Sequence, residues 1–195
     1  MDSVSYSIGV DFGTGLASGI KNIPGEKLNI DIIVAAFANA LKGNEPLIPH
    51  EFATEYFQNY YQAQVKEKFQ KEGAEFLAKN KQEKGVVTLP SGLQYLVLTE
   101  GTGAKPAADQ QVTVNYEGFL VDGTKFDSSI DRGEPATFGV TQVIKGWTEA
   151  LQLMPVGSKW KLFIPYDLAY GEQGAGQFIP PYATLVFEVE LLEIK

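Results

Sequence analysis

The spacing of hydrophobic and polar residues changes near residue 85 of this 195-residue chain. Before that point, apolar residues recur at steps of three and four, which is the period of an amphipathic helix. After it, apolar and polar residues alternate, which is typical of strands buried on one side. We therefore predict two domains, a helical one over residues 1–82 and a sheet-containing one over residues 83–195.

Two helices are predicted in the N-terminal domain. The first lies in IDIIVAAFANALKG, where Asn29 or Asp31 can serve as the N-cap and Gly43 as the stop signal. Its apolar residues at helical spacing are Ile33, Phe37, Ala40 and Leu41. The second helix begins at Pro49 and continues for about thirty residues, or roughly 45 Å at 1.5 Å per residue, with Gly73 as a point where it can bend.

The long helix is polar and aromatic, and mostly charged residues follow Gln70. We expect its end to stand in solvent. Roughly 80 residues in such an arrangement make a marginal core, so pairing with a second copy is the simplest way to bury the aromatic side chains. We predict a two-fold symmetric homodimer through the N-terminal helices. The alternative is a monomeric helical subdomain folded back on the rest of the chain.

Three strands of alternating polarity are predicted in the C-terminal domain, in QVTVNYEGFL, SKWKLFIP and ATLVFEVELLEI. Asp122 and Gly123 signal a hairpin turn after the first of them. A short helix in VIKGWTEALQLM carries Ile144, Trp147 and Leu151 on one stripe. The expected class is α+β, an antiparallel sheet wrapped on a short helix, preceded by an all-α dimerisation domain with a long connecting helix.

Composition and charge exclude several classes of function. The chain has 16 basic and 24 acidic residues and a net charge of −8, which argues against mainly electrostatic binding to nucleic acid or anionic lipid. It has no cysteine, which excludes disulfides and thiolate chemistry. No apolar run reaches the length of a membrane span. The start, MDSVSYSIGV, lacks the features of a signal peptide, so we read the chain as a cytoplasmic protein or as a mature form whose leader has been removed.

The usual catalytic and cofactor-binding patterns are not present. His50, the single histidine, has no partner at the start of the long helix, so we interpret it as a surface residue. The GTG stretches at 13–15 and 101–103 lack the strand, helix and spacing of a dinucleotide fingerprint. DFGTG at 11–15 has no accompanying kinase motif. The acidic loop around Asp127 and Asp131 could suggest a glycosidase, but Arg132 favours a structural ion pair. We expect no metal and no cofactor.

Aromatic residues are the remaining candidates for a site. Tyr116 and Phe187 have the parity of core residues, and Trp147 lies on the helix face that should meet the sheet. Others lie near turns and strand ends: Phe126, Phe138, Tyr170 and Phe178. All of them can simply be core, which is our interpretation of Trp160 and Phe163. A helix beside such a sheet can also leave an aromatic cleft for a small ligand or a peptide.

Four stretches carry a resemblance to a known family: VNYEGFLVDGTKFDSS, QVIKGWTEAL, FIPYDLAYGEQGAG and IPPYATLVFEVELLEI. In this order they closely resemble the FKBP-type peptidyl-prolyl cis-trans isomerases, over about residues 83–195. The helices and the GVVTLPSGLQY junction before them are similar to the two-domain bacterial branch that includes the macrophage infectivity potentiator proteins. The resemblance implies an enzyme of protein folding, a rotamase with an FKBP-like catalytic domain.

The resemblance also implies a site, residue by residue. Trp147 would form its floor, and the walls would be Tyr116, Phe126, Phe138, Val143, Ile144, Tyr170 and Phe187. Asp127 would accept a contact at the rim and pair with Arg132. The Ile144 N–H and the Tyr170 hydroxyl would bind substrate carbonyls, and Phe178 and Ile179 would lie on a loop over the cleft. The chain departs from the usual pattern at Ala136, and Ala175 and Phe178 occupy variable positions, which affects the preferred residue before proline.

Such a site needs no nucleophile, because the reaction breaks no covalent bond. A peptide bond resists rotation by ~18–20 kcal/mol, and X–Pro bonds populate both isomers and exchange slowly. Preferential binding of the twisted amide in an apolar pocket is then sufficient. The expected substrates are proline-containing unfolded or folding proteins, and tacrolimus and rapamycin are expected inhibitors. The alternative is a protein-binding chaperone module with incidental isomerase activity. The resemblance favours a periplasmic or cell-surface location in the full precursor over a cytoplasmic one.

Overall fold

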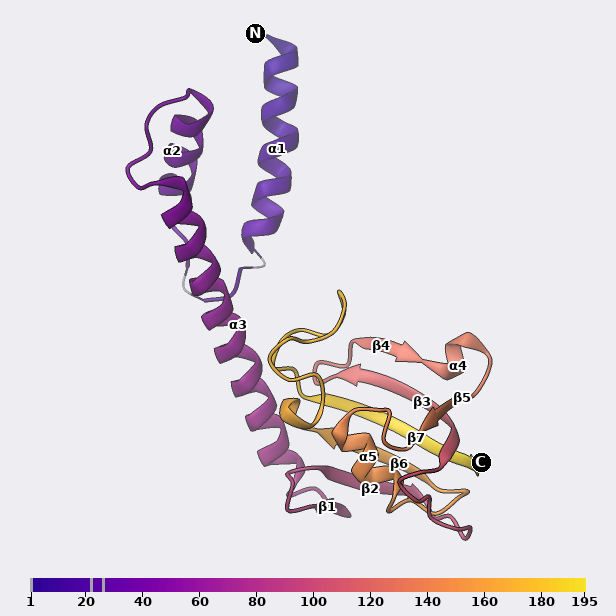
Figure 1. Ribbon diagram of the computed structural model, residues 1–195. Helices are drawn as coiled ribbons and strands as arrows, with labels where there is room; N and C mark the ends of the chain where they lie inside the picture. The colour runs from indigo at the N-terminus through magenta and orange to yellow at the C-terminus, as the bar shows by residue number, and fades with distance from the viewer. Residues whose placement is uncertain (1, 22, 26) are drawn as a thin grey trace. The chain divides into compact units, whose positions relative to one another are not determined.

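The computed structural model describes residues 2–21, 23–25 and 27–195. It divides into two compact units, and the division lies between Val65 and Lys66 (Figure 1). The division falls inside one continuous helix, α3 (His50–Asn80), whose first half belongs to one unit and whose second half belongs to the other. No helix in the described part of the chain is long and apolar enough to cross a membrane.

The first unit contains α1 (Ser3–Lys21), α2 (Ile30–Leu41) and the beginning of α3. The predicted start of α2 is confirmed, because the Asn29 side chain accepts a hydrogen bond from the Ile32 N–H and caps the helix. The long helix is confirmed as well, with 31 residues beginning after Pro49. Sequence reasoning did not delimit α1, whose four glycines lower its helix propensity.

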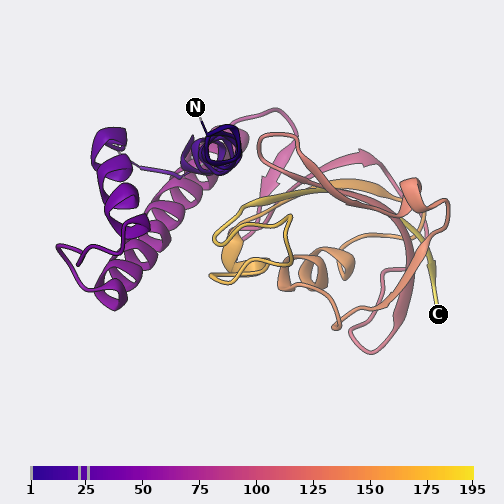
Figure 2. The same ribbon diagram turned by 90° about the horizontal axis from the view of Figure 1, so that it is seen from above.

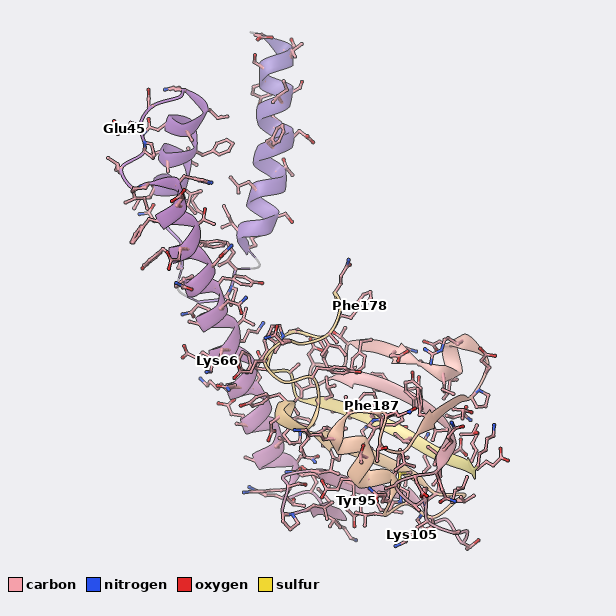
Figure 3. All side chains as sticks on the ribbon, in the orientation of Figure 1. Glu45, Lys66, Tyr95, Lys105, Phe178 and Phe187 are labelled. Atoms are coloured by element: carbon pink, nitrogen blue, oxygen red, sulfur yellow. The ribbon has the colours of Figure 1, made fainter. Side chains whose placement is uncertain are left out.

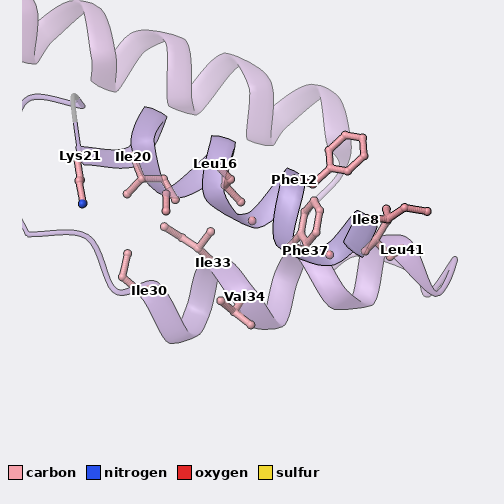
Figure 4. Close-up of a pocket in the computed structure, with 13 residues that line it drawn as sticks. Ile8, Phe12, Leu16, Ile20, Lys21, Ile30, Ile33, Val34, Phe37 and Leu41 are labelled. Carbon is pink, nitrogen blue, oxygen red and sulfur yellow. The ribbon is translucent and has the colours of Figure 1, made fainter. Parts of the chain in front are cut away.

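The apolar residues of the first unit are poorly covered within one copy. Val65 is its only buried apolar residue among those described. Between α1 and α2 lies a cavity of about 690 Å³ whose walls are almost entirely apolar (Figure 4). The lining residues include Phe12 and Leu16 of α1 and Ile33 and Phe37 of α2. The described part of the first unit therefore has no closed hydrophobic core of its own.

The second unit is built on a seven-stranded sheet in which all paired strands are antiparallel. The strand order is β1-β2-β6-β7-β3-β4, and β5 also pairs with β3. The strands are β1 (Val86–Thr88), β2 (Gln94–Thr99), β3 (Gln111–Leu120), β4 (Lys125–Ser128), β5 (Ala136–Gly139), β6 (Lys159–Ile164) and β7 (Leu185–Ile194). The helices are the second half of α3, α4 (Ser129–Arg132), α5 (Lys145–Leu151) and the 3-10 turn η1 (Tyr166–Leu168). The predicted α+β class is confirmed.

Burial along the strands follows the predicted alternation. On β3 the residues Val112, Val114 and Tyr116 are buried, and the polar residues between them are partly exposed. The hairpin at Asp122 is confirmed, because β3 pairs with β4 and Gly123 takes the positive φ of 88° that the turn requires. The sheet curves around α5, which lies on its concave side (Figure 2). The core therefore sits between α5 and the inward-facing residues of β3, β6 and β7.

The expectation that the end of α3 stands in solvent is wrong. Gly73 is buried, and a Cβ there would lie 2.3 Å from Thr184 Oγ1. The Phe76 ring contacts the Phe163 ring of β6 with centroids 5.9 Å apart, and Gln70 donates to the Tyr166 hydroxyl at 3.1 Å. These residues of α3 recur at three-residue steps and share a face, so the charged residues between them lie outward.

Candidate functional site

Trp147 on α5 is the centre of an aromatic cluster. Its side chain is 4% exposed, and its ring makes edge-to-face contacts with those of Tyr116, Phe187 and Phe138 at centroid distances of 5.2, 5.3 and 5.9 Å. Gly146 lets the helix approach the sheet this closely, because a Cβ at that position would lie 2.5 Å from Cγ2 of Ile164. Edge-to-face geometry places the positive ring edge on a neighbour's negative face, so the contacts favour one fixed arrangement.

A cavity of about 210 Å³ opens above this cluster. It is lined by Tyr116, Phe126, Asp127, Phe138, Gln142, Val143, Ile144, Trp147, Tyr170 and Phe187. The lining residues come from six segments that are separate in the sequence: β3, β4, β5, the turn into α5 with α5 itself, the segment after η1, and β7. The lining includes a single carboxylate and no histidine or cysteine.

The polar part of the cavity is one network of three residues. The Tyr116 hydroxyl donates to Oδ2 of Asp127 at 2.5 Å, and Arg132 donates to the Tyr116 hydroxyl at 2.8 Å and forms an ion pair with Asp127. The expectation of a structural ion pair is confirmed. The expected single acidic loop is wrong, because Asp127 lies on β4 and Asp131 lies in α4, where Asp131 pairs with Lys125 instead.

This network holds Asp127 as a carboxylate. Partial burial acts to raise the pKa of its carboxyl group, but hydrogen bonds from Tyr116 and Arg132 outweigh it and place the pKa below the ordinary value. Burial and the hydrogen bond to Asp127 raise the pKa of the Tyr116 hydroxyl. At neutral pH the rim therefore presents a charged acceptor beside a protonated phenol, and both are held in place by Arg132.

Several donors at the cavity are left without partners among the described residues, and two of them are the Ile144 N–H and the Tyr170 hydroxyl. Among the described residues, neither the Ile144 N–H nor the Tyr170 hydroxyl makes a hydrogen bond. Burial, and to a smaller extent the charge of Asp127, raise the pKa of Tyr170, so its hydroxyl keeps its proton at neutral pH. Unpaired donors beside aromatic walls can bind carbonyl oxygens of a ligand whose apolar part fills the cavity.

Most of the predicted site residues line the cavity, and three do not. Arg132 lies behind Asp127 and Tyr116 rather than in the lining. Ile179 is 8% exposed and packs in the core, because its N–H and carbonyl pair with Ala175 and turn its side chain inward. Phe178 is 69% exposed and lies at the outer end of its loop, whereas Phe187 lies within the strands (Figure 3). The structure thus differs from the expectation that both loop residues cover the cleft.

Gln142 lines the cavity and was missed by sequence reasoning. It lies in the turn before α5, where its N–H donates to the Gly139 carbonyl at 2.9 Å. The other lining residues were predicted from their aromatic or apolar side chains, and a glutamine in a turn carries no such signal. Only its position immediately before Val143 and Ile144 could have indicated its place in the site.

Comparisons with known proteins cover the whole chain. A family model described as FKBP-type peptidyl-prolyl cis-trans isomerase matches residues 102–192, and one described as the domain amino terminal to FKBP-type peptidyl-prolyl isomerase matches residues 1–97. The chain is 49% identical to the FKBP-type 22 kDa peptidyl-prolyl cis-trans isomerase of Escherichia coli, covering 97% of this chain and 93% of that protein. It is 44% identical to the outer membrane protein MIP of Legionella longbeachae, covering 100% of this chain and 85% of that protein.

A solved structure matches nearly the whole chain. The crystal structure of FkpA from Escherichia coli matches with a TM-score of 0.77 at 37% identity, covering 99% of this chain and 95% of that chain. At this identity the match extends from the fold to the family, and it covers the N-terminal helices as well as the sheet domain.

Proposed function

Because the chain belongs to the FKBP-type peptidyl-prolyl cis-trans isomerases and is an enzyme of that class, we propose that the cavity above Trp147 is its active site. The observation that carries the proposal is the lining itself, which has aromatic walls, one carboxylate and unpaired donors that include the Ile144 N–H and the Tyr170 hydroxyl. Such a site suits a reaction that breaks no covalent bond. Proline-containing proteins are the substrates that the family implies.

In this proposal, the proline ring of the substrate lies on Trp147, and the aromatic walls exclude water from the X–Pro amide. Twisting removes amide resonance and reduces the dipole of the group, so an apolar cavity penalises the planar amide more than the twisted one. The Ile144 N–H and the Tyr170 hydroxyl bind the flanking carbonyls and hold the substrate chain in place while the X–Pro amide twists. The acceleration comes from tighter binding of the transition state than of either planar isomer.

Asp127 has a supporting electrostatic role in this proposal. Its carboxylate accepts a polar contact from the substrate at the rim, and Tyr116 and Arg132 keep it charged and oriented. Because the network is assembled before substrate binds, little reorganisation is needed during the reaction.

Protease-coupled isomerisation of short X–Pro peptides tests the function. We expect activity in the wild type that rapamycin blocks, and losses of roughly 10- to 100-fold in kcat/KM for Phe187→Ala and Asp127→Ala, since each removes one wall or rim contact. Circular dichroism would establish that both variants remain folded. A folded but inactive wild type would contradict the proposal and leave a protein-binding chaperone module as the alternative function.

We further propose that the first unit forms a two-fold homodimer through the faces of α1 and α2 that line the apolar cavity. The support is the absence of a closed core in the described part of that unit, together with the apolar lining shared by the two helices. A second copy inserted here would remove these side chains from water, and apolar burial is the main favourable contribution to such association. The predicted division into residues 1–82 and 83–195 assigns dimerisation to the first part and isomerase activity to the second.

Two neighbouring isoleucines of α2 provide a matched test of the dimer. Ile33 lines the cavity, whereas Ile32 does not line it and is 66% exposed. We expect Ile33→Glu to give monomers in analytical ultracentrifugation, because a charge would be buried in the interface, and Ile32→Glu to remain dimeric. Dissociation of both variants or of neither would contradict the assignment of this face.

The Ile33→Glu and Ile32→Glu variants also test whether dimerisation helps the enzyme to act on folding proteins. We propose that two catalytic domains held by one dimer act on a folding protein more effectively than single ones. The monomeric Ile33→Glu variant should then keep wild-type activity on a short peptide and lose acceleration of a refolding reaction limited by proline isomerisation. Equal behaviour on both substrates would count against this proposal.

An exported location is also proposed, since one relative is named an outer membrane protein. Cell fractionation of the full precursor is the test, and recovery with cytoplasmic markers would refute it.

A further inference from the structure

Tyr182 has an unusual backbone conformation. It lies between Pro181 and Ala183, just before β7, and has a φ of 61°, while every other positive φ in the described chain belongs to a glycine. The left-handed region is unfavourable for a residue with a side chain, because Cβ approaches the following carbonyl oxygen. Glycine would satisfy this backbone without strain. A tyrosine here points to a requirement for the ring, and strained residues of this kind gather at functional sites.

The Tyr182 ring is held from two sides. Its side chain is 8% exposed and makes an edge-to-face contact with Tyr166 of η1, with centroids 5.4 Å apart. Lys66 of α3 places Nζ 5.4 Å from the ring centroid, in a cation–π contact; Figure 3 labels Lys66 on this helix. The Tyr166 hydroxyl in turn accepts a hydrogen bond from Gln70 of α3 at 3.1 Å. The second half of α3 therefore contacts both Tyr182 and Tyr166.

Backbone hydrogen bonds connect Tyr182 to the segment that carries Tyr170 at the cavity. Its N–H donates to the Gly171 carbonyl at 2.9 Å, and the Gly171 N–H donates to the Tyr166 carbonyl at 2.8 Å. Gly171 is therefore held on both sides, at the base of the loop over residues 171–182. The residue immediately before it is Tyr170, whose hydroxyl is one of the unpaired donors at the cavity.

We propose that Tyr182 is a positioning residue that sets the Tyr170 hydroxyl over the cavity, and that Lys66 and Gln70 of α3 support it. This inference rests on the proposed function of the cavity. The alternative is that Tyr182 is an ordinary buried ring whose removal only lowers stability. The positive φ argues against it, because a ring needed only for packing does not require a strained backbone at the point where the loop closes.

Tyr182→Gly is the direct test, because glycine tolerates the φ and removes only the ring. We expect KM for a short X–Pro peptide to rise about tenfold with kcat little changed, since the Tyr170 contact is made with planar and twisted substrate alike. Tyr182→Phe keeps the ring and should restore the wild-type KM. Phe76→Leu, which weakens another ring contact of the same helix, should lower the melting temperature and leave KM unchanged.

A double-mutant cycle separates positioning from a general loss of stability. In a Tyr170→Phe background, Tyr182→Gly should raise KM no further, because the hydroxyl that it positions is already gone. Additive effects, or a wild-type KM in Tyr182→Gly, would overturn the inference. If Tyr182→Gly does not fold, Gln70→Ala should raise KM in the same direction, and an unchanged KM there would overturn it equally. Inactivity of the wild type would instead refute the proposed function.

Discussion

Replacing Trp147 with leucine should remove most of the isomerase activity while the protein remains folded. The indole lines the cavity and contacts three of its aromatic walls, so its loss affects the proposed proline site and the positions of Tyr116, Phe138 and Phe187 together. We expect kcat/KM to fall at least about 100-fold, which corresponds to ~2.7 kcal/mol of transition-state stabilisation at 1.36 kcal/mol per factor of ten. The peptide assay measures the change directly.

Trp160 is a matched control for this substitution. It is 5% exposed, against 4% for Trp147, and both indole N–H groups are buried without a partner among the described residues. Trp160 stacks on Tyr95 of β2 with centroids 4.2 Å apart and does not line the cavity. Both variants should lose stability, each by less than the ~3–5 kcal/mol expected for truncation to alanine. Of the two variants, Trp147→Leu should lose isomerase activity and Trp160→Leu should keep it. Equal losses of activity would show that the loss of stability causes the loss of activity.

Gly118→Ala is the second substitution expected to have a large effect. A Cβ at this position of β3 would lie 2.7 Å from Cε2 and Cζ of Phe126 and 2.7 Å from Cε1 of Phe187. Both rings line the cavity and pack edge to face with centroids 5.5 Å apart, so they must shift together. Overpacking of this kind costs ~1–3 kcal/mol of stability. We expect a fall of roughly 10- to 100-fold in kcat/KM, because displaced walls misplace the substrate.

Gly103→Ala provides the corresponding control. Its Cβ would lie 2.7 Å from that of Val156, so it also overpacks, but neither residue lines the cavity. Calorimetry should show comparable destabilisation in the two variants, and titration with rapamycin should show weaker binding only in Gly118→Ala. Wild-type affinity and activity in Gly118→Ala would mean that the walls adapt and that the close approach at this glycine is unimportant to the site.

The long elements could be predicted because their patterns repeat. Strand β3 was predicted with the same bounds as observed, since ten residues of alternating polarity match only a half-buried strand. The start of α2 followed from a capping residue, and the turn at Asp122 from its neighbouring glycine. The short strands β1 and β5 were not delimited, because three or four residues are too few for a period to appear. Strand β2 was not delimited because its apolar residues are consecutive and do not alternate with polar ones.

The lining of the cavity was predicted largely from the family resemblance. From the residues alone, Tyr116, Trp147 and Phe187 could be assigned to the interior but not to one cluster. The resemblance brought them together with Asp127 and Tyr170, and those five residues do line a single cavity. It did not indicate the place of Ile179, whose inward direction depends on a backbone pairing with Ala175 within its own loop.

The sequence by itself determined the local structure and the kind of chemistry, because both depend on neighbouring residues and on which residue types are available. Without cysteine and with one unpartnered histidine, it favoured a site that works by apolar binding. Only the tertiary structure decided that the polar end of α3 packs on the sheet, that Gly118 makes room for two rings and that Tyr182 accepts a left-handed backbone. Each of these three features depends on residues that are distant in the sequence, or on a backbone geometry that the neighbouring residues do not specify. Because the interior is closely packed, each feature forms only when all the residues in contact with it are in place.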